Sequence, residues 1–515
     1  MSATDKQDSR AVDPSEPSAP PELFVLCDER GPILYAPLGN LMARANAPAV
    51  AAALAYARDP STVEEMSGDE RAVVEALGER GFFKHRSYPR HAVGFQPVQV
   101  TLFPTNNCNL RCSYCYAFGG EGGGNGEPLT RMDLCVAQRA IDLIARNAKA
   151  RADRGEPIRN FLVSIHGNGE PFCAYDLIQQ IVWYGQDVSE ELGIPAVFNA
   201  ATNGVLSEEQ LDFVVANFNS VNVSFDGLPE FQDANRPMAG GRGSFERVDH
   251  TMRRLSEAHV GFGIRTTVTA AMVDRMSDIV AFVAERYPGL EQLHLEPVWE
   301  CGRCVTSSNV MPTSEAFVRR YLEALEVAQQ MGVRLVFSGA RQDMLVDTFC
   351  KVSSGSFTVT PTGDVTACYE VSYRSDPRSE RFFFGHFDHD LGDFVFDQAK
   401  LDALSELNVH NIRFCDDCFC RWHCAGDCAA KVLDGIPLER HHGSVRCQIS
   451  RALTLNQIQR KLDWRHTDGW RDKRLQRPRT YGGQRQRPAQ ATDRDHRRRQ
   501  QHLQAWHEDL LRGRL

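Results

Sequence analysis

The sequence predicts an α/β fold: a partial (β/α)6 barrel with a small N-terminal α+β domain and a loop-rich C-terminal domain. Between residues 96 and 312, six apolar, β-branched segments alternate with helical segments, which is typical of a parallel sheet covered by helices. Six repeats are too few to close an eight-stranded barrel, so we expect an open one. Residues 350–455 lack this alternation and contain eight of the 16 cysteines.

The composition is that of an ordinary globular protein. The 515 residues suffice for two or three domains, and 42% of them are hydrophobic and 24% charged. No apolar run approaches the roughly 18 residues of a membrane-spanning helix. Residues 1–21 are acidic, rich in Ser and Pro and lack the apolar core of a signal peptide. We therefore expect a disordered leader and a cytoplasmic protein without membrane attachment.

Charge is distributed unevenly along the chain. The net charge is −9, yet residues 460–515 contain 16 Lys and Arg against seven Asp and Glu. Because phosphate binding needs a basic surface, the acidic remainder argues against nucleic acid as the main partner. Residues 456–515 have little aliphatic periodicity, and we expect a basic, disordered tail to which we assign no function.

Residues 22–95 predict the small N-terminal domain. Two strands joined by a turn around Gly31 and Pro32 precede an Ala-rich helix, and a second helix over residues 67–81 stops at Gly81. This order resembles the winged-helix leader-recognition domains attached to many peptide-modifying enzymes. A plain structural cap is the alternative. The strand and helix pattern is separate from every cysteine motif.

The barrel elements follow in order. Its strands are expected at residues 98–105, 159–167, 196–204, 220–227, 261–269 and 291–299. Helical stretches between them include residues 133–150, 176–192 and 244–259. A helix at 313–332 and a strand at 333–339 begin a bridging segment that ends at residue 349. In barrels of parallel strands the chemistry lies at the carboxyl ends of the strands, so motifs there are candidate site residues.

The cysteine content points to metal. Clustered cysteines in a reducing compartment bind metal more often than they form disulfides. Residues 356–370 predict a hairpin closed by a turn at 361–364. Because residues 350–455 offer few aliphatic side chains for a core, we expect metal to hold this domain together.

The strongest motif follows the first barrel strand. Cys108, Cys112 and Cys115 have the spacing Cys-x3-Cys-x2-Cys within one loop. Three thiolates can hold three irons of a [4Fe–4S] cluster and leave the fourth iron open, as a catalytic metal site requires. A structural zinc site would need a fourth Cys or His nearby, and none follows in the loop.

With Tyr114 before the last cysteine, this loop resembles the signature of the radical S-adenosylmethionine (SAM) superfamily. The resemblance implies that the open iron chelates SAM and that reductive cleavage of SAM yields a 5′-deoxyadenosyl radical, which abstracts a hydrogen atom from the substrate. The cofactor supplies this chemistry and the protein positions it. The resemblance also implies an external electron donor such as flavodoxin or ferredoxin.

The turn after the second barrel strand is the next candidate. Gly167, Asn168, Gly169 and Glu170 resemble the Gly-Gly-Glu-Pro element that contacts the methionyl amino group of SAM in this superfamily. Asn168 departs from the usual pattern. A Gly-rich turn before a helix is common by itself, and only its position after the strand favours a role in binding.

Four further residues are candidates for SAM contacts by the same resemblance. Asn203 and Ser224 stand at the ends of the third and fourth strands, where polar side chains bind the ribose or the carboxylate, although each could simply form a turn. Arg236 and Arg265 are rival candidates for the SAM carboxylate, because an Arg guanidinium matches a carboxylate. The sequence does not choose between them.

The C-terminal cysteines resemble the SPASM domain, a module that holds auxiliary iron–sulfur clusters. The resemblance implies that one cluster is bound by Cys415, Cys418, Cys424 and Cys447. It implies that the other takes Cys350, Cys368 and Cys428. Zinc is the competing interpretation for a Cys-x2-Cys pair.

Two complete auxiliary clusters need an eighth ligand. Cys301 and Cys304, after the sixth strand, are the candidates, and a turn at 302–303 slightly favours Cys304. Otherwise the iron is open or bound by a substrate group. Cys420 matches no motif, and a plain buried or surface thiol is the simplest interpretation.

The residues after Cys368 bear on the substrate. Sulfatase-maturing relatives carry an Asp base immediately after this cysteine, whereas Tyr369 and Glu370 follow it here. Sulfatase oxidation is therefore less expected, and Tyr369 and Glu370 are candidate proton acceptors or substrate contacts. Packing alone is the alternative for a Tyr in a hairpin.

Together these features predict a maturase that modifies a ribosomally made precursor peptide by cross-linking, thioether formation or another C–H oxidation. A rival hypothesis within enzymes is modification of a folded protein partner, as sulfatase-maturing enzymes do. A rival from another class is a non-catalytic, metal-bound binding scaffold. Iron content and release of 5′-deoxyadenosine separate enzyme from scaffold.

Overall fold

The computed structural model describes residues 22–86, 88, 94–122, 126–350, 355–433 and 436–464. All of these lie in one compact unit, Met1–Asp468, whereas the second unit, Gly469–Leu515, lies outside the described residues, as does the predicted leader. None of the helices in these ranges is both long and apolar enough to cross a membrane.

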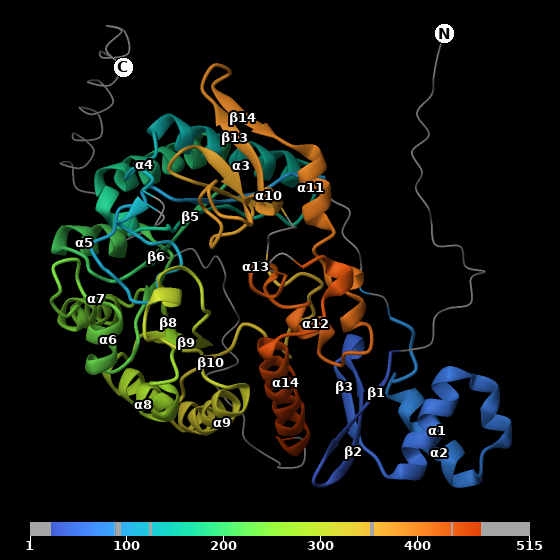
Figure 1. The fold of residues 1–515 in the computed structure, drawn as a ribbon. Helices are drawn as coiled ribbons and strands as arrows, with labels where there is room; N and C mark the ends of the chain where they lie inside the picture. The colour runs from blue at the N-terminus through green and yellow to red at the C-terminus, as the bar shows by residue number, and fades with distance from the viewer. Residues whose placement is uncertain are drawn as a thin grey trace, which may run out of the picture. The chain divides into compact units, whose positions relative to one another are not determined.

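The barrel sheet contains the six predicted strands in chain order, all parallel (Figure 1). They are β4 (Gln99–Leu102), β5 (Phe161–Ile165), β6 (Ala196–Thr202), β7 (Ser220–Ser224), β8 (Phe262–Val268) and β9 (Leu290–Pro297). A short parallel strand, β10 (Leu335–Val336), follows β9 at the edge of the sheet and falls within the predicted strand at 333–339. The sheet does not close on itself, which confirms the partial barrel.

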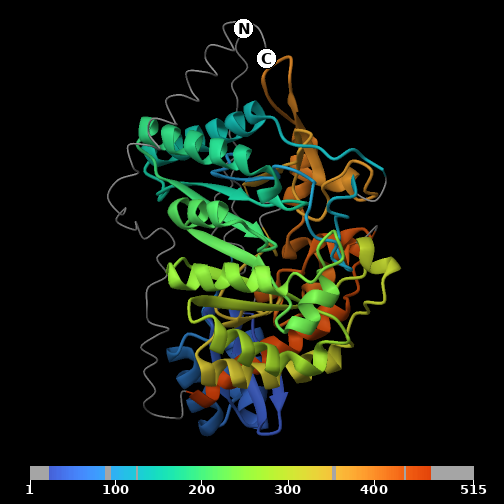
Figure 2. The same ribbon diagram turned by 90° about the vertical axis from the view of Figure 1, so that its left-hand side faces the viewer.

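Helices cover one face of this sheet (Figure 2). They are α3 (Leu134–Asp153), α4 (Tyr175–Leu192), α5 (Glu208–Asn217), α6 (Pro229–Asn235), α7 (Phe245–Glu257), α8 (Met276–Arg286) and α9 (Ser314–Met331). Their ends follow local sequence signals. Ser207 and Gln210 form a capping box at the start of α5, and Gly332 ends α9 with a φ of 71°.

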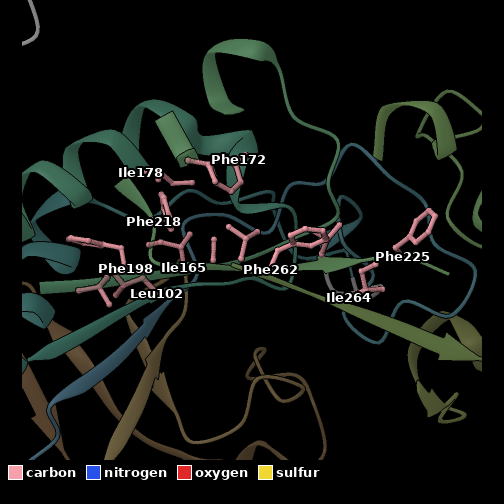
Figure 3. Packing of buried hydrophobic residues seen from close by; sticks show 14 of the residues in the cluster. Leu102, Ile165, Phe172, Ile178, Phe198, Phe218, Phe225, Phe262 and Ile264 are labelled. Carbon is pink, nitrogen blue, oxygen red and sulfur yellow. The ribbon is translucent and has the colours of Figure 1, made fainter. Parts of the chain in front are cut away.

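Side chains along each strand alternate between the two faces. Those on the helix-covered face are apolar and buried, and they pack against helix and loop residues such as Phe172, Ile178 and Phe218 (Figure 3). The opposite face, here called the inner face, carries polar side chains from neighbouring strands. The registers place these residues in two rows, Thr101–Ser164–Asn199 and Ser224–Arg265–His294.

The C-terminal segment continues the barrel sheet. The predicted hairpin is present as β11 (Ser356–Val359) and β12 (Asp364–Thr366), and β11 pairs in parallel with β4. Two further antiparallel strands, β13 (Phe383–Asp388) and β14 (Asp393–Phe396), extend the sheet. The hairpin therefore provides hydrogen-bond partners for the backbone of β4, which would otherwise be an exposed edge of the sheet.

Short helices and one long helix complete this segment. They are α10 (Ser379–Phe382), α11 (Gln398–Ser405), α12 (Arg421–Cys424), α13 (Ala429–Val432) and α14 (Val445–Trp464). Helix α14 continues past residue 455, where the auxiliary segment was expected to end. Ile458 and Leu462 are buried there, at 0% and 4% exposure, so the apolar face of the helix extends into the predicted tail.

The N-terminal domain has one strand more than the sequence indicated. Strands β1 (Phe24–Asp28), β2 (Gly31–Ala36) and β3 (Leu41–Arg44) form an antiparallel sheet that precedes α1 (Ala47–Arg58) and α2 (Gly68–Glu79). Strand β3 has only four residues, too few for a visible alternation.

This domain is not separate from the cysteine motifs. Apolar residues of the N-terminal sheet form one buried cluster with the auxiliary segment and with α14. Its buried members are Leu26, Ile33, Tyr35, Met42, Cys418, Phe419, Cys420, Cys424, Ile458 and Leu462. The expectation of a separate unit is therefore wrong: the short sheet buries one face against the cysteine-rich loop.

Candidate active site

The three-cysteine loop begins at the carboxyl end of β4. The backbone N–H of Cys115 donates to the carbonyl oxygen of Cys112 at 3.2 Å, which folds the loop into a tight turn. The thiols of Cys108 and Cys115 each accept a backbone N–H bond at 3.4 Å, from Leu110 and Gly119. N–H groups directed at sulfur stabilise thiolate, the form that binds metal.

The segment after β9 holds this loop in place. Arg303 donates to the carbonyl oxygens of Cys112 at 2.8 Å and Gly119 at 3.2 Å. Gly302 has a φ of 56°, and a Cβ atom there would lie 2.4 Å from the carbonyl oxygen of Cys115. Only glycine fits this contact. The sequence singled out this segment for its cysteines, and no motif indicated the clamping role of Arg303.

The donor set fits an iron–sulfur cube. Burial raises the pKa of Cys108 and raises that of Cys112 to about 11, so metal binding must displace their protons. Within the described ranges, no three His, Cys, Asp or Glu side chains converge on one metal position. The cysteine ligands of a cube bind separate irons, so such convergence is not required.

The turn after β5 lies directly against the cysteine loop. A Cβ atom at Gly169 would lie 2.2 Å from the carbonyl oxygen of Asn107, and the N–H of Glu170 donates to that oxygen at 2.8 Å. The Asn168 side chain is 3% exposed, and neither of its amide atoms has a hydrogen-bond partner among the described residues. An amide buried without partners fits a polar ligand placed beside it.

Glu170 connects the ends of two strands. Its carboxylate accepts hydrogen bonds from the Thr202 hydroxyl at 2.8 Å, the Asn203 N–H at 2.7 Å and the Phe172 N–H at 3.2 Å. Burial raises the pKa of Glu170 to about 7, and these bonds oppose the shift. Both carboxylate oxygens are thus bonded within the protein, which gives Glu170 a positioning role.

Asn203 and Ser224 differ in their surroundings. The Asn203 amide donates to the Asn109 side chain at 2.7 Å and accepts from the Val205 N–H at 2.9 Å, so it supports the cysteine loop. Ser224 ends β7 on the inner face, and its hydroxyl has no hydrogen bond to the part of the chain that the structure describes.

The structure separates the two rival arginines. Arg236 is 8% exposed and pairs with the fully buried Asp226 at 3.1 Å. Its guanidinium carbon lies 5.2 Å from the centre of the Tyr114 ring. The Tyr114 hydroxyl also donates to Asp226. Arg265 is exposed on the inner face, in register with His294. Arg236, but not Arg265, is thus packed against the cysteine loop.

The auxiliary cysteines form two neighbourhoods. Burial raises the pKa of Cys415, and the thiols of Cys424, Cys418 and Cys447 raise it further. Burial raises the pKa of Cys368, with further contributions from Cys428, Glu370 and Cys350. The division into two ligand sets that the resemblance implies stays a prediction. The Cys420 thiol lies 3.4 Å from the Cys418 thiol, so it adjoins the first set.

Cys301 and Cys304 have different environments. Cys304 is buried with Tyr114 and Val298, and its thiol lies 3.5 Å from the carbonyl oxygen of Asn309. Cys301 is half-buried, and its pKa rises to about 12 through burial and the adjacent Glu370 carboxylate. The Glu370 carboxylate also raises the pKa of Cys368 and of Cys428. Cys301 therefore adjoins the second auxiliary set. This reverses the preference for Cys304.

Tyr369 and Glu370 point in different directions. The Tyr369 hydroxyl lies 3.0 Å from the Thr101 hydroxyl, and its ring stacks on His166 with centroids 5.0 Å apart. Glu370 pairs with Lys431 at 3.0 Å, and one of its oxygens is buried without a hydrogen bond in the described chain. Only Tyr369 reaches the inner face of the barrel.

A family model described as the radical SAM superfamily matches residues 102–278. Over 272 residues the chain is 26% identical to an uncharacterized protein of Methanocaldococcus jannaschii, covering 52% of this chain and 84% of that protein. It is 25% identical over 230 residues to the sporulation killing factor maturation protein SkfB of Bacillus subtilis, covering 42% and 48%. It is 25% identical over 180 residues to a cysteine-type anaerobic sulfatase-maturating enzyme of Clostridium novyi, covering 33% and 44%. The chain thus spans about half the length of the two maturation proteins.

Solved structures share the fold at low sequence identity. Native anSMEcpe with bound AdoMet has a TM-score of 0.54 and 16% identity, over 71% of this chain and 99% of that one. Streptococcus suis SuiB bound to S-adenosylmethionine has a TM-score of 0.50 and 14% identity, over 82% and 98%. The matched residues 102–278 contain the three-cysteine loop at the end of β4 and the Glu170 turn at the end of β5, so the chain carries a radical SAM domain.

Proposed function

We propose that this enzyme modifies a ribosomally made precursor peptide and that two auxiliary [4Fe–4S] clusters assist it. One observation carries the proposal: the hairpin that precedes Cys368 joins the barrel sheet beside β4, and Tyr369 after it reaches the inner face. A radical SAM enzyme uses a [4Fe–4S] cluster and SAM, and here the auxiliary cysteines adjoin the same sheet. The scaffold hypothesis does not account for this arrangement.

Cys108, Cys112 and Cys115 would hold the catalytic cluster. When bound, the cluster and SAM supply a 5′-deoxyadenosyl radical that abstracts a hydrogen atom from the substrate. Arg236, fixed by Asp226 and stacked on Tyr114, is positioned to bind the SAM carboxylate with its remaining guanidinium nitrogens. The Asn168 amide and the Ser224 hydroxyl are the further candidate contacts.

The auxiliary cysteines would complete the redox apparatus. Removing a hydrogen atom and forming a new bond on the substrate leaves one electron to be accepted, and an auxiliary cluster can take it. A flavodoxin or ferredoxin would supply the electron for SAM cleavage. Clustered cysteines that bind metal suit the reducing cytoplasm that we propose as its location.

The relatives favour a peptide or protein substrate. Both SkfB and the Clostridium enzyme are maturation proteins by name, and a solved structure of anSMEcpe contains a bound peptide at a TM-score of 0.53. Modification of a folded partner stays the second candidate because of the sulfatase-maturating relative. Tyr369 at the position after Cys368 favours the precursor peptide.

Anaerobic reconstitution tests the proposal. The purified enzyme, given iron, sulfide, dithionite and SAM, should release 5′-deoxyadenosine, and a short peptide encoded beside its gene should lose mass corresponding to two hydrogen atoms. An enzyme with full iron content that releases no 5′-deoxyadenosine would contradict the radical chemistry. Release without any change in the peptide, together with modification of a folded partner, would favour the second candidate.

A further inference from the structure

Arg265 is a cation on the inner face of the barrel, without a partner among the residues that the structure describes. It lies in β8, in register with Ser224 on one side and His294 on the other. Its side chain is exposed, and its guanidinium forms neither a hydrogen bond nor an ion pair with the residues that the structure describes. Arg236, the arginine packed against the cysteine loop, is the one that we propose for the SAM carboxylate, which leaves Arg265 without an assigned role.

The acidic side chains around this region are already paired. Glu296, two residues beyond His294 on the same face, accepts from the Ser338 N–H at 2.7 Å and pairs with Arg446 at 3.2 Å. Glu370 pairs with Lys431 at 3.0 Å. The positive charge of Arg265 is therefore left for a ligand.

The histidines nearby are neutral at physiological pH. Burial lowers the pKa of His166 and of His294 to about 4, and the adjacent Arg265 guanidinium lowers each further. His166 Nδ1 accepts from the Gly167 N–H at 2.8 Å, and the buried Nε2 of His294 has no hydrogen bond in the described chain. The region thus offers one permanently charged side chain, Arg265, and one imidazole nitrogen, His294 Nε2, without a hydrogen bond in the described chain.

Tyr369 completes this surface. Its ring stacks on His166 with centroids 5.0 Å apart, and its hydroxyl bonds to Thr101 on β4. One region, where the hairpin that precedes Cys368 meets the inner face, is therefore surrounded by the side chains of Arg265, His166, His294 and Tyr369.

We infer that Arg265 binds a carboxylate of the peptide substrate and so places the residue to be modified beside Tyr369. The guanidinium presents paired N–H donors that match the two oxygens of a carboxylate, and binding an anion compensates a charge that the protein leaves unpaired. The inference rests on the proposed function, because it names an acidic peptide as the substrate. The carboxylate comes from an Asp or Glu side chain or from the peptide C-terminus.

Equilibrium dialysis of the reconstituted enzyme with SAM tests this inference. Three labelled tripeptides are the probes. N-acetyl-Ala-Glu-Ala-amide carries a side-chain carboxylate, and N-acetyl-Ala-Gln-Ala carries a C-terminal carboxylate. N-acetyl-Ala-Gln-Ala-amide carries neither. At least one carboxylate peptide should bind about tenfold more tightly than the amide peptide, as expected for loss of a charge-assisted bond. Arg265→Gln should remove this preference and Arg265→Lys should keep part of it. The control Arg319→Gln, an exposed arginine on α9, should keep all of it.

Equal binding of all three peptides to the wild-type enzyme would overturn the inference. So would an equal loss in Arg319→Gln, because the effect would then be general electrostatics. Weaker SAM binding by Arg265→Gln, with the peptide preference retained, would assign the guanidinium to SAM instead. Loss of auxiliary iron in Arg265→Gln would mean that the guanidinium supports an auxiliary cluster and would also overturn the inference. Release of 5′-deoxyadenosine by the wild type is measured in parallel: its failure counts against the proposed function, whereas equal peptide binding with normal release counts against the inference alone.

Discussion

The Tyr35 hydroxyl and His423 Nε2 are joined by a buried hydrogen bond of 2.5 Å that connects the N-terminal sheet to the auxiliary segment. His423 Nδ1 donates a hydrogen bond to the carbonyl oxygen of Met344 at 2.9 Å, because a carbonyl oxygen can only accept. In the neutral ring Nε2 is then the acceptor, and the Tyr35 hydroxyl is the donor. Both side chains are fully buried. The contact lies within the cluster that contains Cys420 and Cys424. The N-terminal domain therefore covers one side of the predicted auxiliary site.

Replacing Tyr35 with Phe should destabilise this contact. The change leaves His423 Nε2 buried without a donor, which costs about 1–3 kcal/mol. Thermal unfolding should begin at a lower temperature than in the wild type, and auxiliary iron should be lost faster to a chelator. The matched control is Tyr56→Phe, because Tyr56 on α1 contacts Phe83 through its ring and its hydroxyl forms no hydrogen bond in the described chain. Equal effects of the two variants would contradict the role of this bond.

Replacing Cys108, Cys112 and Cys115 together with Ala should remove the catalytic cluster alone. The three thiols lie in one loop, and neither auxiliary neighbourhood includes them. The variant should lose about four irons per chain, the content of one [4Fe–4S] cluster, and should release no 5′-deoxyadenosine. Iron analysis and chromatography of the nucleoside measure both. Loss of all iron, or continued release, would contradict the assignment of this loop.

The six barrel strands could be predicted from the sequence because each is a local apolar, β-branched segment between helical segments, whereas the four-residue strand β3 was missed. The pairing of β11 with β4 could not, because it joins residues about 250 positions apart and leaves no local pattern. The same limit applies to the arginines. Arg236 follows a short helix after the fourth strand and Arg265 lies within the fifth strand, and only the three-dimensional contacts of Asp226 and Tyr114 separate them.

Replacing Asp226 with Asn should show what the buried pair with Arg236 contributes. Removing one partner leaves the guanidinium buried and uncompensated, which costs about 3–5 kcal/mol. We expect lower stability in chemical unfolding and weaker SAM binding. The control is Glu208→Gln on the surface, where Glu208 pairs with Arg254 and His250, because an exposed pair contributes only about 0–1 kcal/mol. Comparable losses in the two variants would contradict a special role for Asp226.

The neutral histidines on the inner face predict a loss of stability in acid. Their folded pKa of about 4 lies below the ordinary value of 6.5, so the unfolded chain binds protons first as the pH falls. Between pH 7.5 and 5.5 each should lower the free energy of unfolding by about 1.4 kcal/mol. His294→Asn should make this acid-induced decrease in the free energy of unfolding smaller by the contribution of one histidine. His389→Asn, at an exposed position, should leave the decrease unchanged. An unchanged pH dependence in His294→Asn would contradict the buried, neutral state of His294.

Cys301 and Cys304 provide the final test, because only two residues lie between them and their surroundings differ. The second auxiliary set has three cysteines, and its fourth ligand must come from a nearby side chain, from solvent or from the substrate. Cys301 adjoins Glu370, whose carboxylate also raises the pKa of Cys368 and Cys428. Cys304 instead packs against Tyr114. Cys301→Ala should therefore change the Mössbauer signal of one auxiliary cluster and lower the iron content.

Cys304→Ala is the matched control. It removes a buried thiol of the same size from the same segment and should leave the Mössbauer signal unchanged, at a stability cost of about 1 kcal/mol for the lost apolar contact. A changed signal in Cys304→Ala alone would identify that residue as the ligand and contradict the assignment. An unchanged signal in both variants would indicate an open auxiliary iron, and peptide added to the wild-type enzyme should then alter its spectrum.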